Sequence, residues 1–276
     1  MPELPEVETN ARNLARWATG RNILAATAPP GTRELGGLSR AAFVRRVVGR
    51  TVLDVTRRGK WILVRLSGRL SGDDGLGIHL GMTGKISNVP GQRFTRATFS
   101  LDDGAVVGFV DSRRFGRLLA AKYEDLLARP DIRRVGPDAL FELDARGLRA
   151  ALARTRRTVK EALLDQTLLA GVGNLYATEA LWRAKIHPAT PAPRVAADAA
   201  KVRRLLAGIR AALRQGLATF EREAIPEYIE EGAPNPFHAY DRAGRPCHRC
   251  GTILKTMVIG GRSSAFCPHC QKLGAR

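Results

Sequence analysis

The hydrophobic pattern of the chain changes near its middle. Between residues 22 and 120, short apolar runs are separated by turns rich in glycine and aspartate, which predicts strands. After residue 123, apolar positions recur every three or four residues, which predicts helices. We expect strands at 51–56, 61–66, 98–101, 105–110 and 117–120, and helices at 5–18, 124–128, 144–153, 159–165, 174–184 and 197–223.

This order of segments predicts an α+β protein with several domains. Two stretches are expected to be irregular: residues 71–75 as a turn, and residues 186–195, with three prolines, as an extended connection between helices. We expect an N-terminal β-sandwich domain with an N-terminal helix over residues 1–128, a linker over 129–140, a helical domain over 141–240 and a small terminal domain over 241–276.

The net charge of the chain indicates which class of molecule it binds. The chain has 276 residues, and 45 lysines and arginines against 26 acidic residues give a net charge of +19. This excess predicts a polyanionic partner, most simply nucleic acid, because cations displace the counterions condensed on phosphates. A simpler explanation, coding bias toward arginine and alanine, accounts for part of it. No apolar run approaches the ~18 residues of a membrane span and the N-terminus does not resemble a secretory signal. We therefore expect a cytoplasmic, nucleoid-associated protein with no membrane partner.

All four cysteines follow residue 246, in the pattern C-x2-C, sixteen residues, C-x2-C: Cys247, Cys250, Cys267 and Cys270. Two such pairs complete a tetrahedral thiolate site for one zinc ion. Four cysteines leave no open coordination position, so the zinc is expected to be structural. His248 and His269 are expected to be spare polar residues. The intervening segment predicts a hairpin with strands at 252–254 and 257–259.

The first residues carry candidate chemistry. If Met1 is removed, Pro2 begins the chain with a secondary amine, whose pKa of ~8 leaves part of it neutral and nucleophilic near neutral pH. Glu3 is adjacent, and Glu6 lies one helical turn further on. A nucleophile with carboxylates in reach suits acid–base catalysis. Taken alone, the same residues could simply begin and cap a helix.

The order of motifs resembles that of the bacterial formamidopyrimidine-DNA glycosylases along essentially the whole chain. Residues 1–9 (MPELPEVET) look like the start of the family, and residues 57–60 (RRGK) look like its lysine loop. The zinc finger has the family's spacing. Two further segments resemble DNA-contact loops and three resemble the helix–two-turn–helix: HLGMTG at 79–84 and DSRRFG at 111–116, then LLDQ at 163–166, AGVGN at 170–174 and EAL at 179–181.

The resemblance implies a base-excision-repair glycosylase with AP lyase activity. Its implied partner is double-stranded DNA containing oxidised bases or abasic sites, which it binds as a monomer carrying one structural zinc. Pro2 is implied as the Schiff-base nucleophile at C1′, Glu3 as the proton shuttle and Glu6 as its hydrogen-bonding support. Lys60 is implied to hold the phosphate beside the lesion and assist β-elimination. Arg262, on the zinc hairpin, is implied to grip the lesion phosphates and act in δ-elimination.

The resemblance also implies a set of DNA contacts. Met82, Arg113 and Phe115 would insert into the duplex as the damaged nucleotide is extruded. From the residues alone, core packing is the alternative for Met82 and Phe115, and an ordinary helix N-cap is the alternative for Asn174. The implied phosphate contacts are His79, Arg156, Lys160, Asn174 and Tyr240.

The chain departs from the family pattern at a few places. Phe94 stands where the family commonly has a phosphate-binding histidine, so that contact is expected to be lost. Ser112 replaces a frequent proline. The segment 228–240 looks short for the family, in a region that closes over flipped 8-oxoguanine. The alternatives are an endonuclease VIII-like glycosylase for oxidised pyrimidines and a non-catalytic damaged-DNA-binding protein. The loop at 113–116 favours the purine-directed branch.

Overall fold

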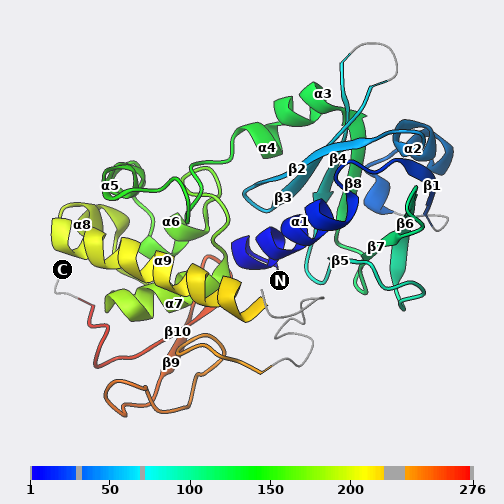
Figure 1. Cartoon of the computed structure of the whole chain (residues 1–276). Coiled ribbons are helices and arrows are strands. Elements are labelled where there is room, and N and C mark those ends of the chain that lie inside the picture. Colours follow the sequence, from blue (N-terminus) through cyan, green and yellow to red (C-terminus); the bar gives the residue numbers. More distant parts are fainter. Residues whose placement is uncertain (1, 29–32, 69–71, 221–233, 274–276) are drawn as a thin grey trace. The chain divides into compact units, whose positions relative to one another are not determined.

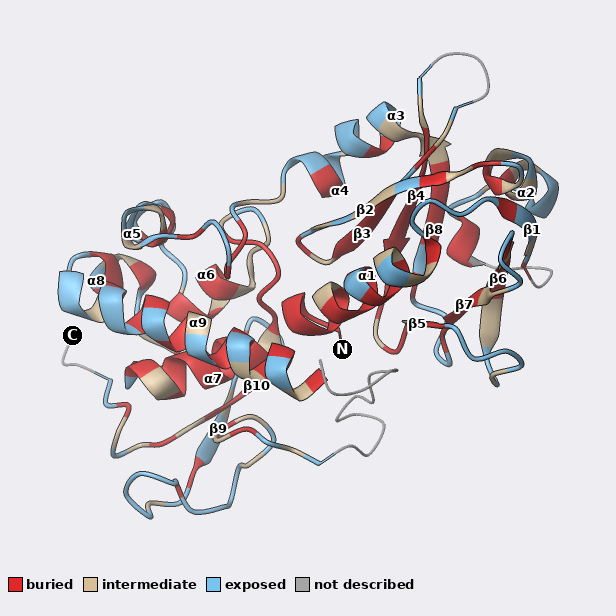
Figure 2. Cartoon of the chain, in the orientation of Figure 1, coloured by how far each residue is buried: buried red, intermediate tan, exposed pale blue. Residues whose placement is uncertain are grey.

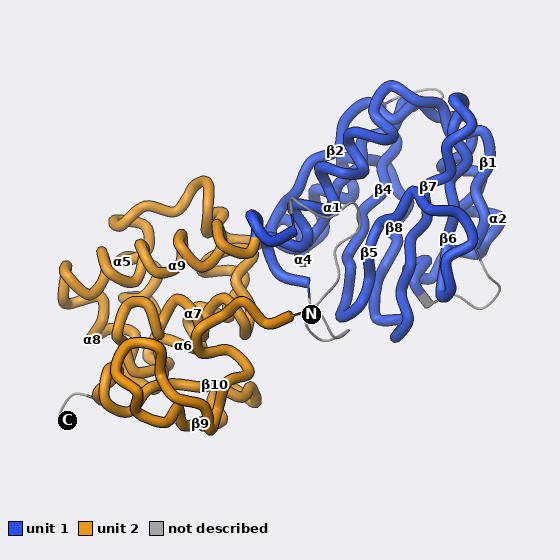
Figure 3. The backbone as a smooth tube through the Cα atoms, turned by 60° about the horizontal axis from the view of Figure 1, so that its bottom comes forward, with its two compact units in different colours: residues 1–134, 217–233 blue, residues 135–216, 234–276 orange. Residues whose placement is uncertain are grey.

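The computed structural model describes residues 2–28, 33–68, 72–220 and 234–273. The chain forms two compact units, residues 1–134 with 217–233 and residues 135–216 with 234–276 (Figure 3). Part of the expected linker is helical, because Pro130 begins the short helix α4 (Pro130–Arg133). The domain boundaries expected at residues 128, 140 and 240 remain predictions. No helix within the described residues is long and apolar enough to cross a membrane.

The first unit contains the expected β-sandwich, built from two four-stranded antiparallel sheets (Figure 1). The strand orders are β1-β6-β7-β5 and β2-β3-β4-β8. The strands are β1 (Ile23–Thr27), β2 (Val52–Arg58), β3 (Trp61–Leu66), β4 (Asp74–His79), β5 (Lys85–Ser87), β6 (Thr95–Leu101), β7 (Val106–Val110) and β8 (Arg117–Lys122). The accompanying helices are α1 (Leu4–Ala18), η1 (Arg33–Leu35), α2 (Arg40–Val47) and α3 (Tyr123–Ala128).

Helix α1 fixes the start of the chain on the sandwich. Its apolar face, including Val7 and Leu14, belongs to the main core with Phe43 and Phe109 (Figure 2). Asn10 is fully buried, and it donates to the Glu6 carbonyl (2.8 Å) while accepting from the Ile86 backbone N–H (2.6 Å). Since Ile86 lies in β5, the first helical turn is tied to a sheet.

The turn expected at residues 71–75 was partly wrong, because Asp74 and Gly75 begin β4. The glycines here serve close packing. A Cβ at Gly75 would lie 2.8 Å from a Leu126 side-chain carbon and 3.1 Å from the Tyr123 Cα, so a larger residue would be crowded by α3. Asp74 is buried against Arg50, with Oδ2 2.9 Å from Nε. Strands β1, β4 and β5 and helix α2 were not predicted as separate elements.

The second unit is helical and ends in a two-stranded hairpin. Residues 186–195 are not wholly extended, because Pro191 precedes α8. Of the two predicted hairpin strands, 257–259 lies within the observed strand Lys255–Ile259, but 252–254 was wrong, because the partner strand follows the turn at Gly260 and Gly261, whose φ angles are 55° and 71°. Its elements are α5 (Ala145–Ala153), α6 (Val159–Leu164), α7 (Asn174–Ala184), α8 (Ala192–Ala196), α9 (Ala199–Phe220), β9 (Lys255–Ile259) and β10 (Arg262–Phe266), the end of α9 being grouped with the first unit.

Candidate active site and nucleic-acid interface

The N-terminal carboxylates form a reciprocal capping box. The Glu3 backbone N–H donates to Glu6 Oε2 at 2.9 Å, and the Glu3 carboxylate accepts from the Glu6 backbone N–H. Both residues are buried, Glu3 at 2 % and Glu6 at 4 % exposure, and Pro2 is buried beside them. The structure thus brings the expected nucleophile and its two carboxylates together at the first turn of α1.

An ion pair links α1 to the hairpin that carries Lys60. Glu8 of α1 accepts from Arg57 Nε at 2.7 Å, and the Arg57 side chain is only 4 % exposed. A second Arg57 nitrogen donates to the Gly59 carbonyl at 2.9 Å. Gly59 has φ +58° in the two-residue turn between β2 and β3, a conformation that glycine adopts without strain. Arg57 therefore positions the backbone immediately before Lys60.

His79, at the end of β4, lies within the electrostatic reach of Lys60. Burial, the positive charge of Lys60 and that of Arg117 lower the His79 pKa to about 4. The imidazole is therefore neutral at physiological pH. Its Nδ1 accepts from the Gly81 backbone N–H at 3.1 Å, so the ring proton is assigned to Nε2. A neutral Nε2–H is a suitable donor to a phosphate oxygen.

His79 predicts a measurable pH dependence. Its folded-state pKa is lowered, so the unfolded chain binds the extra proton, and stability is lost as pH falls from about 6.5 toward about 4. Between about pH 7 and about pH 5, the free energy of unfolding should fall by about 1–2 kcal/mol less in His79→Gln than in wild type. Urea titration at each pH measures both values. His187→Gln is the comparison: burial alone lowers the His187 pKa, without the added positive charges that act on His79, so this variant should reduce the loss by a smaller amount. Equal pH slopes for wild type and His79→Gln would contradict the assignment.

The loops expected to enter DNA are both organised by Asp111, which is fully buried. Its Oδ1 accepts from the Thr83 hydroxyl (2.7 Å) and the Arg113 backbone N–H (3.2 Å), and its Oδ2 accepts from the Gly116 backbone N–H (2.7 Å). One carboxylate thus joins the loop after Met82 to both ends of the Arg113–Gly116 turn. Phe115 is 54 % exposed, with the Arg113 guanidinium 5.2 Å from its ring centre. Core packing is therefore excluded for Phe115, while Met82 is half-buried.

Removing the Asp111 carboxylate should loosen both loops. Asp111→Ala leaves the Thr83 hydroxyl and the Gly116 backbone N–H without this acceptor, while the Arg113 N–H keeps only its bond to Thr83 Oγ1 (3.2 Å), so we expect a loss of about 3 kcal/mol in unfolding free energy and weaker DNA binding. Urea denaturation and binding to an abasic-analogue duplex measure the two effects. The exposed Asp125 provides the control, since Asp125→Ala should change stability by less than about 0.5 kcal/mol. Equal effects of the two variants would refute the organising role.

Asn174 is the first residue of α7, and Gly173, not Asn174, is the N-cap. The ordinary N-cap interpretation of Asn174 is therefore wrong. Lys160 is fully buried below this turn, with Nζ donating to the Asn174 carbonyl (3.0 Å) and the Thr178 hydroxyl (2.5 Å). The structure differs here from the implied direct contact of Lys160 with phosphate. The ammonium instead fixes the backbone that carries Asn174.

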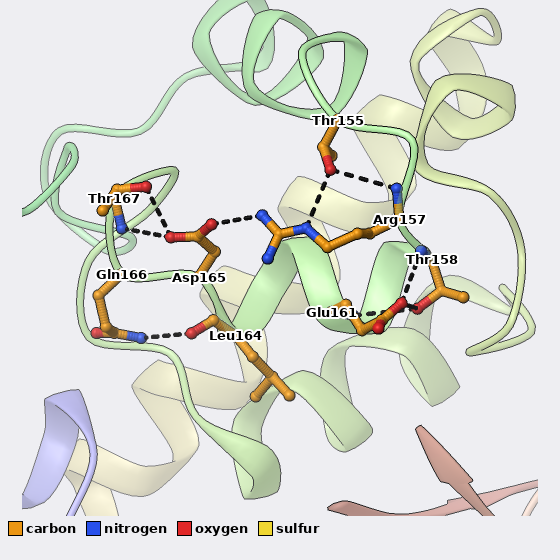
Figure 4. Close-up of polar contacts among 8 residues, drawn as sticks. All are labelled: Thr155, Arg157, Thr158, Glu161, Leu164, Asp165, Gln166 and Thr167. Carbon is orange, nitrogen blue, oxygen red and sulfur yellow. Dashed lines mark hydrogen bonds and ion pairs between the residues drawn. The ribbon is translucent and has the colours of Figure 1, made fainter. Parts of the chain in front are cut away.

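Figure 4 shows how the turn region around α6 is held. Burial acts to raise the Asp165 pKa, but hydrogen bonds from Arg157 and Thr167 outweigh it and lower the pKa below its usual value. Thr158 and Glu161 form a capping box at the start of α6. The Gln166 side chain donates to the Leu164 carbonyl, as Figure 4 shows. It also donates to the Val172 carbonyl on the other side of the turn. Arg156, exposed beside this network, is free to face solvent or a ligand.

The segment before the zinc finger is anchored by Glu179, a fully buried residue of α7. Its Oε1 accepts from the backbone N–H groups of His238 (3.1 Å), Ala239 (2.6 Å) and Tyr240 (2.9 Å). Three consecutive donors on one carboxylate hold this backbone to the helix. Tyr240 is therefore fixed in place and half-buried, which leaves its predicted phosphate contact open to test.

The four cysteines come together as expected, with their sulfur atoms all within 4.8 Å of one another. Cys250 Sγ lies 3.5 Å from both Cys267 Sγ and Cys270 Sγ, near the edge length of about 3.8 Å of a tetrahedral zinc–thiolate site with bonds of about 2.3 Å. The cysteines therefore fit one structural zinc. Arg262 is exposed at the start of β10, at the tip of the hairpin that this site holds.

The finger also rests on the end of α7. The Arg249 guanidinium lies 3.9 Å from the Trp182 ring centre and donates to the Trp182 carbonyl (2.6 Å). Trp182 shares a small core with Cys247 and Cys267. No role was predicted for Asp111, Arg57 or Glu179, although each lies inside a motif that resembles the family. For Asp111 and Glu179 the signal was an acidic residue within an otherwise basic or neutral motif, whereas Arg57 lies among residues of its own charge and offered no such signal.

Comparison with known proteins identifies this architecture. Three family models match in order: the formamidopyrimidine-DNA glycosylase N-terminal domain over residues 1–118, the H2TH domain of the same enzymes over 135–224, and a zinc finger found in FPG and IleRS over 244–273. The formamidopyrimidine-DNA glycosylase of Acidothermus cellulolyticus is 41 % identical, covering 100 % of this chain and 99 % of that protein. The counterpart from Deinococcus radiodurans is 36 % identical, covering 99 % and 98 %.

Comparison with solved structures indicates the same family. The MutM (Fpg) protein of Thermus thermophilus matches with a TM-score of 0.82 and 34 % identity, covering 99 % of this chain and all of that one. The Lactococcus lactis Fpg bound to DNA containing Fapy-dG matches with a TM-score of 0.83 and 26 % identity, covering 98 % and 100 %. The fold and the site thus define a DNA glycosylase of base-excision repair with a zinc finger and a helix–two-turn–helix. The chain belongs to the formamidopyrimidine-DNA glycosylase family, whose members combine glycosylase and lyase activity.

Proposed function

We propose that this chain removes oxidised purines from duplex DNA and cleaves the resulting abasic strand through an N-terminal proline. The observation that carries the proposal is the pair of buried carboxylates, Glu3 and Glu6, held against each other directly after Pro2. A binding protein needs no such group. We propose that it acts as a single chain on DNA of the bacterial nucleoid.

The proposed chemistry begins with the Pro2 nitrogen, freed by removal of Met1, which lies outside the described residues. The nitrogen forms a bond to C1′ as the glycosidic bond breaks, and the base leaves with a proton. Glu3 takes the proton that the Pro2 nitrogen loses and delivers it to the sugar ring oxygen as the C1′–O bond breaks, giving an iminium, while the departing base takes its proton from solvent. Glu6 holds Glu3 in place through the bond from the Glu3 N–H.

Elimination follows from the iminium, which acidifies the C2′ proton. Loss of that proton breaks the C3′–O bond, and the 3′ phosphate leaves; the same process at C4′ then breaks the C5′–O bond. Water finally releases Pro2. In this proposal Lys60 holds the leaving phosphate, Arg262 grips the lesion phosphates, and the exposed Arg113 and Phe115 occupy the gap left by the extruded nucleotide.

The preference for oxidised purines is supported by the Arg113–Gly116 loop and by the relatives. Solved relatives are bound to DNA containing Fapy-dG and to DNA containing carbocyclic 8-oxo-G. The endonuclease VIII-like alternative keeps some support, since a Lactococcus lactis Fpg is also bound to DNA containing an oxidised pyrimidine. The short segment 228–240 bears on this choice, but residues 228–233 lie outside the described part of the chain.

Borohydride trapping tests the proposal. Duplexes carry one lesion each: formamidopyrimidine, 8-oxoguanine, dihydrouracil or an abasic site. Adducts with both purine lesions support the proposal, and an adduct with formamidopyrimidine alone would assign the loss of 8-oxoguanine activity to the short segment. An adduct with dihydrouracil but neither purine would move the chain to the pyrimidine-directed alternative. No adduct with the abasic site, from zinc-loaded protein that begins at Pro2, would leave only DNA binding.

A further inference from the structure

A cluster of Arg93, Phe94 and Arg96 spans the end of the loop between β5 and β6 and the start of β6. Phe94 is 41 % exposed. The guanidinium carbons of Arg93 and Arg96 lie 4.6 Å and 5.8 Å from the centre of its ring, both within the range of about 6 Å for a cation–π contact. An exposed ring is not explained by core packing, so this cluster differs from the apolar residues of the sandwich.

The backbone at Phe94 is also unusual. Its φ is +69°, in the left-handed region that glycine and asparagine occupy at lower cost than an aromatic residue. Such strain persists only where surrounding contacts impose it, and it is concentrated at functional positions. The turn therefore holds an exposed aromatic side chain in a conformation that phenylalanine does not itself favour.

Two sets of contacts hold this conformation: a local turn, in which the Thr95 backbone N–H donates to the Gln92 carbonyl at 3.2 Å, and bonds to the DNA-contact loop. The Asp111 backbone N–H donates to the Phe94 carbonyl at 3.1 Å, and Arg96 Nε donates to the Asp111 carbonyl at 2.7 Å. The cluster is thus attached on both sides of the residue that organises Arg113 and Phe115. Residues 88–96 and 112–117 together contain five arginines against the adjacent buried Asp111, and one of the five, Arg114, pairs with Glu34. This combination of local positive charge and an exposed aromatic ring suits a nucleic-acid backbone.

We propose that the cluster is a phosphate-binding element for DNA. Arg93 donates to a backbone phosphate oxygen, Phe94 supports the plane of its guanidinium, and Arg96 anchors the loop. The proposal rests on the proposed function, because the duplex in question is the one that Arg113 and Phe115 enter. It also revises the expectation that the contact is lost at Phe94: the cation is supplied by the neighbouring arginine in place of a histidine at position 94.

Salt-dependent binding to a duplex with a tetrahydrofuran abasic analogue, which the lyase cannot cleave, tests this element. Arg93→Gln should weaken binding about three- to tenfold near physiological salt and make the slope of log affinity against log salt shallower by about 0.9, the value for one phosphate contact. Arg45→Gln is the matched control, because it removes an exposed arginine of α2 and the same charge. Equal losses in the two variants would overturn the proposal and leave only an effect of net charge.

Two further variants separate the ring from the cation. Phe94→Leu should weaken binding by a smaller factor, about two- to fivefold, with an unchanged melting temperature. Adding Phe94→His to Arg93→Gln should recover affinity, since an imidazole at position 94 can donate to the same phosphate. No recovery, or wild-type binding by Phe94→Leu, would contradict the assigned roles. The assay requires no catalysis, so failure of wild-type trapping would refute the proposed chemistry without deciding this binding site.

Discussion

Pro2→Gly is expected to abolish the borohydride-trapped adduct and to lower strand cleavage by about a thousandfold or more. Glycine still offers an α-amine, but it forms a neutral imine that must be protonated, whereas proline gives a permanently charged iminium. Glycine also lacks the ring that fixes the nitrogen next to the buried Glu3. The measurement is single-turnover trapping on an abasic duplex with protein whose N-terminus has been verified by mass spectrometry.

The control for this prediction is Pro5→Ala, which changes the other proline of the first helical turn and leaves the terminal amine intact. It should retain trapping, while Pro2→Gly should retain binding to the tetrahydrofuran duplex. If Pro2→Gly traps DNA at the wild-type rate, the nucleophile lies elsewhere. Peptide mapping of the adduct would then show whether Lys60 is the attacking amine.

Removal of zinc is expected to have the second large effect. Zinc binding in small fingers contributes about 10–16 kcal/mol of apparent free energy, comparable to the whole stability of a domain. The core of the finger also contains Trp182 of α7, so its loss should extend beyond the hairpin. We expect chelation, or Cys267→Ala, to lower affinity for the abasic-analogue duplex by about a hundredfold and to lower the melting temperature.

Metal analysis before and after chelation should find one zinc per chain and then none, and added zinc should restore binding. His269→Ala is the control for the metal site, because His269 is exposed and lies outside the four-thiolate cluster. Arg262→Gln separates charge from folding: it should keep zinc and the melting temperature but bind less tightly. Full DNA binding by metal-free protein would exclude the structural role of the finger in recognition.

The comparison of sequence with structure shows which signals are local. Helix α1 and strand β3 were predicted almost to the residue, because their periodicity and their turn residues agree. Strand β4 was missed since Gly75 and Gly77 look like turn residues, although here they admit α3 and the Trp61 ring. The two glycines are required by packing between segments that are distant in the sequence, and no local sequence pattern indicates such packing.

In the candidate site, too, some features were predicted from local sequence and others depend on contacts between distant segments. Cysteine spacing alone predicted the metal site, and the cluster of sulfurs agrees with it. The supporting residues could not be found in this way. Asp111 acts on Thr83, 28 positions away, and Glu179 acts on Tyr240, 61 positions away. A single sequence identifies residues with distinctive chemistry, whereas the partners that orient them depend on the completed fold.

Helix α7 has a consequence for how this enzyme can be altered. One end carries Asn174 above the buried Lys160, and the other end holds the finger through Trp182, with Glu179 between them. A single inserted residue within α7 would rotate everything beyond it by about 100° and shift it by about 1.5 Å along the axis. The finger is therefore not a portable module, and grafting it between relatives would require exchange of the whole helix that supports it.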